Sequence, residues 1–132
     1  MKITLLLDHD IEGYLNYLAA AWHDSNWDQV IQVEFKILRD YGLPDDLPDQ
    51  EIWRFAQAHH RLLITANRNN DDATSLQATL RRENTTDSLP VITISRREGL
   101  KQSAYRRRVV LRLAEIIFDL DDHLGLGRLF VP

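Results

Sequence analysis

The chain has 132 residues, a formal net charge of −4, and shares of hydrophobic and charged residues (44% and 27%) that are ordinary for a soluble protein. This length predicts one domain, residues 1–132, able to bury roughly two-thirds of its unfolded surface. The lack of cysteine excludes disulfides and thiolate chemistry and favours a cytoplasmic location. No apolar run approaches the roughly 18 residues of a membrane helix, and the N-terminus lacks a secretory signal pattern.

Strand and helix patterns alternate in the first half of the chain. Lys2–Leu7 is a short apolar run that predicts a buried strand. Four apolar residues then repeat at helical spacing: Ile11, Leu15, Leu18 and Trp22. Gln32–Ile37 alternates polar and apolar residues, as a half-exposed edge strand does. Two prolines and a glycine mark residues 41–48 as a loop, and a helix is predicted over residues 49–59.

The second half continues the alternation. A third strand is predicted over residues 62–65 and a fourth over 90–94, with a short helix over 72–82 between them. A long final helix is predicted over 102–123, followed by a small strand over 129–131. Strands that alternate with helices predict an α/β domain of three layers, α/β/α, with a mostly parallel sheet of four to five strands.

The predicted final helix is apolar over most of its circumference. Beside its main apolar stripe lies a second one, formed by Leu111, Ala114 and Phe118. A helix of this kind is usually buried on two sides. The second stripe therefore favours a homodimer.

Polar side chains that can ligate a metal follow two of the predicted strands. Asp8 and Asp10 follow the first strand, and Asn67 and Asn69 follow the third. The carboxyl ends of parallel strands meet at one edge of a sheet, where ligands bind. Oxygen ligands collected there suit Mg²⁺ or Mn²⁺ and phosphate-ester chemistry.

Charge is distributed unevenly along the chain. Residues 1–72 hold 6 basic and 13 acidic side chains, whereas residues 73–132 hold 10 basic and 7 acidic ones. An acidic pocket beside a basic flank suits a metal site that faces a phosphate backbone, although two solvated faces would give the same count. The candidate contacts to RNA phosphates are Arg96, Arg97, Arg106, Arg107 and Arg108.

The order of these motifs resembles the compact PIN-like domains of small bacterial proteins. Residues 6–11 correspond to a strand that ends in aspartate, residues 49–52 to a helix that begins with an acidic residue, and residues 62–69 to a strand followed by a Thr-x-Asp-x-Asp-like turn. The resemblance covers the first 72 residues and the strand that follows. It is moderately specific, because each motif is short and only their order and spacing are distinctive.

The resemblance implies a metal-dependent ribonuclease, often a toxin paired with an antitoxin. By position it assigns catalytic roles to Asp8, Asp49 and Asn67, with Asn69 as a further metal ligand, and gives Thr65 a role in shaping the turn. Asn67 and Asn69 stand where family members more often carry aspartate. A neutral amide supplies no charge, so metal affinity should fall.

Structural roles compete with these assignments. Asp71 offers a compensating carboxylate, but it lies a few residues into the next helix start. Asp10 precedes the first helix and suits an N-cap, Asp49 suits the helix dipole, and Asn67 and Asn69 are also typical turn residues.

Two functions follow, and the sequence leaves the choice between them open. One is a ribonuclease that uses Mg²⁺ or Mn²⁺, with RNA as substrate. The other is a catalytically inactive binding or regulatory module of the same fold, which acts on a protein partner such as an antitoxin. A phosphate-accepting receiver-like domain, suggested by Asp8, Thr65 and Lys101, is disfavoured because no aspartate ends the third strand.

Overall fold

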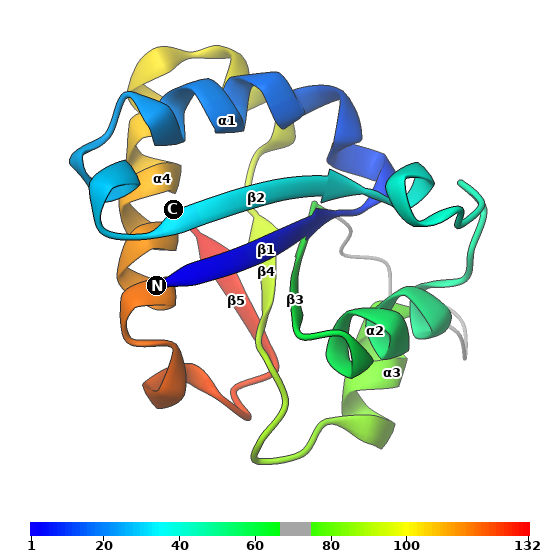
Figure 1. Ribbon diagram of the computed structural model, residues 1–132. Helices are drawn as coiled ribbons and strands as arrows, with labels where there is room; N and C mark the ends of the chain where they lie inside the picture. The colour runs from blue at the N-terminus through cyan, green and yellow to red at the C-terminus, as the bar shows by residue number, and fades with distance from the viewer. Residues whose placement is uncertain (67–74) are drawn as a thin grey trace.

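The computed structural model describes residues 1–66 and 75–132 (Figure 1). Its centre is a five-stranded sheet in the order β2-β1-β3-β4-β5, in which every pair of neighbours is parallel. The strands are β1 (Lys2–Leu7), β2 (Gln32–Ile37), β3 (Arg61–Thr65), β4 (Val91–Ile94) and β5 (Arg128–Val131). The predicted α/β class and mostly parallel sheet are confirmed.

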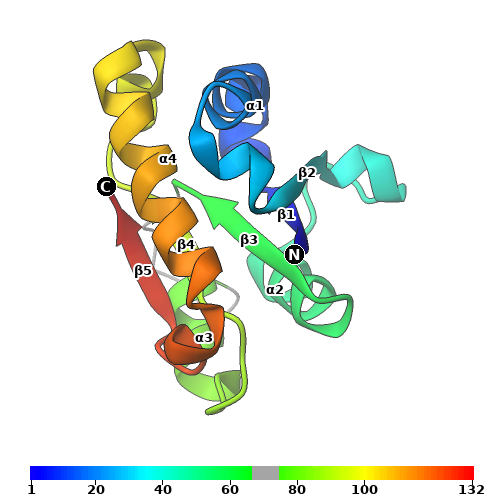
Figure 2. The same ribbon diagram turned by 60° about the vertical axis from the view of Figure 1, so that its left-hand side comes forward.

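Helices cover both faces of this sheet. The α-helices are α1 (Leu15–His23), α2 (Asp49–Ala58), α3 (Leu76–Glu83) and α4 (Ser103–Phe118). Short 3₁₀ helices join them: η1 (His9–Tyr14), η2 (Asn26–Gln29), η3 (Leu38–Tyr41), η4 (Arg97–Lys101) and η5 (Leu120–His123). In both ribbon views, α1 and α4 lie side by side on one face of the sheet (Figures 1 and 2), and α2 and α3 lie together on the other.

The strand pattern explains the two layers. Side chains of a strand alternate between faces, so Leu5 and Leu7 of β1 join the core under α1 and α4, whereas Leu6 joins the core under α2 and α3. All three leucines are fully buried. A strand buried on both faces is a continuous apolar run, which is how the sequence indicated β1.

The boundaries of β1 and β2 are confirmed as predicted, and β2 lies at the edge of the sheet. The final helix was predicted too long, because α4 ends at Phe118 and η5 follows it. Three aspartates beyond this end are unfavourable at the negative end of a helix dipole: Asp119, Asp121 and Asp122. No helix of the described residues is long and apolar enough to span a membrane.

The predicted second stripe of the final helix is wrong at one position. Ala114 is fully buried in the core, whereas Leu111 and Phe118 are 52% and 50% exposed. Ala114 lies three residues after Leu111, which turns it about 60° towards the sheet. The exposed apolar surface of α4 is therefore carried by Leu111 and Phe118.

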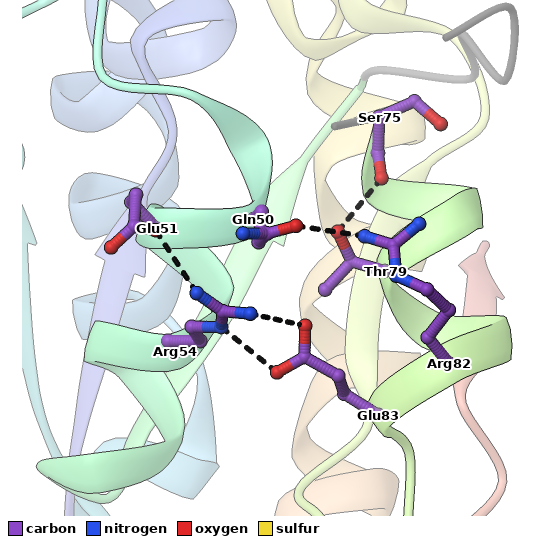
Figure 3. Close-up of polar contacts among 7 residues, drawn as sticks. All are labelled: Gln50, Glu51, Arg54, Ser75, Thr79, Arg82 and Glu83. Carbon is purple, nitrogen blue, oxygen red and sulfur yellow. Dashed lines mark hydrogen bonds and ion pairs between the residues drawn. The ribbon is translucent and has the colours of Figure 1, made fainter. Parts of the chain in front are cut away.

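Polar side chains join α2 to α3 (Figure 3). The Arg54 guanidinium donates from Nε and Nη2 to the two carboxylate oxygens of Glu83, each at 2.9 Å, and Nη1 donates to Glu51 at 3.1 Å. Arg82 donates to Gln50 at 2.8 Å. These contacts join the last turn of α3 to the first half of α2.

Candidate functional site

Asp8 lies where β1 ends, at the carboxyl edge of the sheet. Because β1 lies between β2 and β3, the residue that follows it is surrounded by neighbouring chain, and Asp8 is only 6% exposed. Its Oδ1 accepts a hydrogen bond from the backbone N–H of His9 at 2.7 Å, and its Oδ2 accepts one from Thr65 Oγ1 at 3.0 Å. Asp8 is therefore the N-cap of η1 and is tied to the end of β3.

Asp10 and Asp49 face the same edge from two other elements. Asp10 Oδ2 accepts a hydrogen bond from the backbone N–H of Ala66 at 3.1 Å, and both its carboxylate oxygens lie 3.4 Å from Thr65 Oγ1. Asp49, the first residue of α2, accepts one from the backbone N–H of Leu76 at 3.1 Å. We refer to Asp8, Asp10, Asp49 and Thr65 as the carboxylate site.

The predicted N-cap role of Asp10 is wrong. The chain turns into a 3₁₀ helix one residue after β1, so Asp8 takes the extended conformation of the cap and Asp10 falls in the first turn. Its side chain is thereby directed across to β3, where it meets Ala66 and Thr65. The structure thus brings Asp10 into the site with Asp8.

Burial and neighbouring negative charge raise the pKa values of the carboxylates. The pKa of Asp8 is raised from 3.8 to about 6, chiefly by burial and then by the negative charges of Asp10 and Asp49, against the hydrogen bonds from His9 and Thr65, which lower it. Burial also raises the pKa of Asp10, although Ala66, Thr65 and Arg97 oppose the rise. The folded protein thus holds acidic groups where their charged forms are disfavoured.

Among the five predicted phosphate-contacting arginines, Arg97 lies at the carboxylate site. Its Nη1 donates to the backbone carbonyl of Asp10 at 3.1 Å. The Arg96 guanidinium lies over the Tyr105 ring, and Arg106 donates to the backbone carbonyl of Leu100 at 3.0 Å. Arg107 and Arg108 are exposed on α4. Their contacts with RNA stay predictions.

Three predicted site residues, Asn67, Asn69 and Asp71, lie outside the described residues. Their roles as metal ligands or supporting groups stay predictions. Of the described positions, Asp49 lies close enough to Asp8 for its negative charge to raise the pKa of Asp8, and the predicted roles of both as metal ligands stay predictions.

A second group of side chains that could hold a metal ion was not identified from the sequence. Ligand atoms of His9, Glu12 and Asp45 all lie within 4.8 Å of one another. His9 Nδ1 is 3.1 Å from Glu12 Oε1 and 3.7 Å from Asp45 Oδ1. The spacing of His9 and Glu12 in one turn was a readable signal, but the loop that supplies Asp45 has no periodicity that would place it.

The two groups differ in chemistry. The carboxylate site offers oxygen donors alone, which suits hard divalent cations such as Mg²⁺ and Mn²⁺. The second group includes an imidazole nitrogen and suits a softer transition metal as well. It also forms ion pairs when His9 is protonated, and these need no metal.

Comparison with protein-family models, with characterised proteins and with solved structures finds no match for this chain. The resemblance to PIN-like domains therefore stays a prediction that rests on the order of the motifs.

Proposed function

We propose that the carboxylate site binds Mg²⁺ or Mn²⁺ and that the protein is a metal-dependent ribonuclease. The observation that carries the proposal is the convergence of Asp8, Asp10 and Asp49 on one edge of a parallel sheet, with Asp8 buried and its pKa raised to about 6. A cluster that disfavours its own negative charge is stabilised by a divalent cation.

The donor set fits such an ion. Asp8 and Asp10 come from the β1–η1 junction and Asp49 from the start of α2, so the three carboxylates approach from different elements. Thr65 donates to Asp8 and fixes its Oδ2, which leaves that carboxylate little rotational freedom. A bound Mg²⁺ or Mn²⁺ would supply an activated water and stabilise charge on a phosphodiester.

Arg97 supports the choice of a phosphate-containing substrate. Its guanidinium lies beside Asp10 and is half exposed, so it can offer donors to a phosphate at the mouth of the site. The basic residues of α4 extend this positive charge along the protein: Arg106, Arg107 and Arg108. A backbone of phosphates is the substrate that such a distribution favours.

The test is cleavage of single-stranded RNA in the presence of Mg²⁺ or Mn²⁺. We expect wild-type activity that EDTA abolishes, and a loss of at least about a hundredfold in Asp8→Asn and Asp49→Asn, since each removes a charge from the ion. His9→Ala is the matched control: it removes the second candidate group but leaves the backbone N–H that Asp8 accepts. Undiminished cleavage by Asp8→Asn would refute the proposal.

A second candidate is a non-catalytic binding module with the same fold. It is favoured by the exposed Leu111 and Phe118 of α4, which offer an apolar surface to a protein partner such as an antitoxin. A protein that binds neither Mn²⁺ nor Mg²⁺ at the carboxylate site would favour this candidate over the nuclease.

A further inference from the structure

The outer face of α4 carries a repeating pattern. Ala104, Leu111 and Phe118 recur every seven residues, and all three are exposed. A spacing of seven places them along one line of the helix, with Leu111 in the middle. The described residues leave about half of Leu111 and Phe118 exposed, because α4 packs on the sheet through its opposite side, where Val109, Leu113 and Ile116 are buried. The Phe118 ring also lies 5.5 Å from the ring of Trp27, which covers part of it.

Two charged residues of opposite sign lie beside the line, one on each side of Leu111 along the helix. Arg108 lies three residues before Leu111 and Glu115 lies four residues after it, and both are exposed. They follow one another at the same spacing of seven, so they occupy the same side of the line. Glu115 is also within 3.4 Å of Arg112, in an exposed pair that water screens. Among the described residues, Arg108 has no ion pair.

We infer that the outer face of α4 binds the α4 of a second copy of this chain, antiparallel, about a two-fold axis at Leu111. In that arrangement Leu111 meets its own copy, and the small Ala104 lies opposite the large Phe118 of the partner. Arg108 lies opposite the partner's Glu115, twice by symmetry. A two-fold interface must be complementary to itself, and this face is so in both size and charge.

The neighbouring helix widens the surface. A stable dimer buries roughly 800 Å² on each partner, which is more than one seam of α4 offers. A groove of about 820 Å³ runs between α1 and α4 and is lined by Tyr17, Trp27 and Leu111. Tyr17 lies on the α1 side of this groove and is 40% exposed. The two helices lie side by side in both ribbon views (Figures 1 and 2), so α1 and the groove adjoin the outer face of α4 and add to the surface that a second copy would contact.

Sedimentation velocity over a range of protein concentrations tests this dimer. We expect the wild type to sediment as a dimer and Leu111→Asp to raise the dissociation constant by about a hundredfold, because it places two carboxylates at the axis. Leu126→Asp is the matched control, since Leu126 is 56% exposed but lies between η5 and β5. A wild type that is monomeric throughout, or an equal loss in Leu126→Asp, would overturn the inference.

A charge exchange tests the antiparallel register. Arg108→Glu and Glu115→Arg should each weaken the dimer by about tenfold, because like charges then face each other at two symmetric positions. The double variant restores opposite charges and should dimerise within about threefold of the wild type. Because both side chains are exposed, neither change should unfold the protein, which circular dichroism checks. A double variant as weak as its parents would overturn this register.

Discussion

Two polar regions of the molecule include residues of α2. One pairs opposite charges at the surface, and the other holds like charges close together in a buried site. On the surface between α2 and α3, Arg54 meets both carboxylate oxygens of Glu83 in an exposed pair (Figure 3). At the carboxylate site, Asp8 lies almost fully buried beside two further acidic residues, and its pKa rises to about 6. The first arrangement joins two helices. The second opposes folding of the metal-free protein, and the cation that we propose for this site would offset that cost.

The two regions are connected through α2 and α3. Both regions involve α3: its first residue, Leu76, donates a backbone hydrogen bond to Asp49, and its last residue, Glu83, accepts from Arg54. The surface contacts therefore support the position of Asp49 without taking part in the site. Removing a charge should have opposite consequences in the two regions.

The largest expected change in stability is that caused by Asp8→Asn in the metal-free protein. The folded-state pKa of Asp8, about 6, lies above its ordinary value of 3.8, so the folded state binds a proton more readily than the unfolded state. Stability therefore falls as pH rises from about 4 to about 6, and the penalty is complete above that. Each unit of pKa corresponds to about 1.4 kcal/mol, so the full penalty is on the order of 3 kcal/mol.

Urea unfolding in EDTA measures this penalty. We expect Asp8→Asn to be more stable than the wild type at about pH 7, by on the order of 2–3 kcal/mol, and the advantage to vanish near pH 4. A wild type whose stability does not change between these pH values relative to the variant would show that Asp8 is not destabilised in the folded protein.

An intermediate effect is expected from Thr65→Val. Thr65 is fully buried and its Oγ1 donates to Asp8 Oδ2, which lowers the pKa of Asp8. Valine keeps the shape but not the donor, so the metal-free protein should lose about 1–2 kcal/mol near pH 7, and the pH at which the fall in stability is complete should move upward, because the folded-state pKa of Asp8 rises. Thr65→Ser, which keeps the hydroxyl, is the control. Equal stability and an unchanged pH profile in Thr65→Val would contradict the account.

The smallest effect is expected at the surface pair. Arg54 and Glu83 are well solvated, so Arg54→Met should lower stability only slightly, and high salt should remove most of the difference. The same urea measurement in low and high salt checks this, with Glu83→Gln as the reciprocal change. If Arg54→Met cost more than Thr65→Val, the surface contact would be a principal support of the fold.

Much of the fold was predictable because its strands carry clear patterns of apolar residues: a continuous run in a strand buried on both faces and an alternation in a half-exposed edge strand. The apolar run before Asp8 and the alternation of Gln32–Ile37 gave two strands with the observed bounds. The position of Asp8 followed, since an acidic residue after a buried strand reaches the edge of the sheet. The early end of α4 was missed, because Leu120 and Leu124 continue the helical spacing past Phe118.

The arrangement of side chains in the site could not be predicted, because it depends on features that leave no periodic pattern in the sequence. Asp10 was expected to cap a helix, and only the 3₁₀ conformation of His9–Tyr14 directs its side chain to Ala66. The group of His9, Glu12 and Asp45 needs the path of a loop, which no periodicity encodes. Residue spacing therefore predicted the edge that holds the site, but not how the side chains meet there.

The most direct test of the central claim is a Mn²⁺ and Mg²⁺ titration of thermal stability, with the wild type beside Asp8→Asn and His9→Ala. Specific binding to the folded state should stabilise the wild type by about 2.7 kcal/mol at a hundredfold excess over Kd. We predict that this gain is lost in Asp8→Asn and kept in His9→Ala. A gain that survives in Asp8→Asn, or no gain in the wild type, would contradict the claim that the carboxylate site binds a divalent cation.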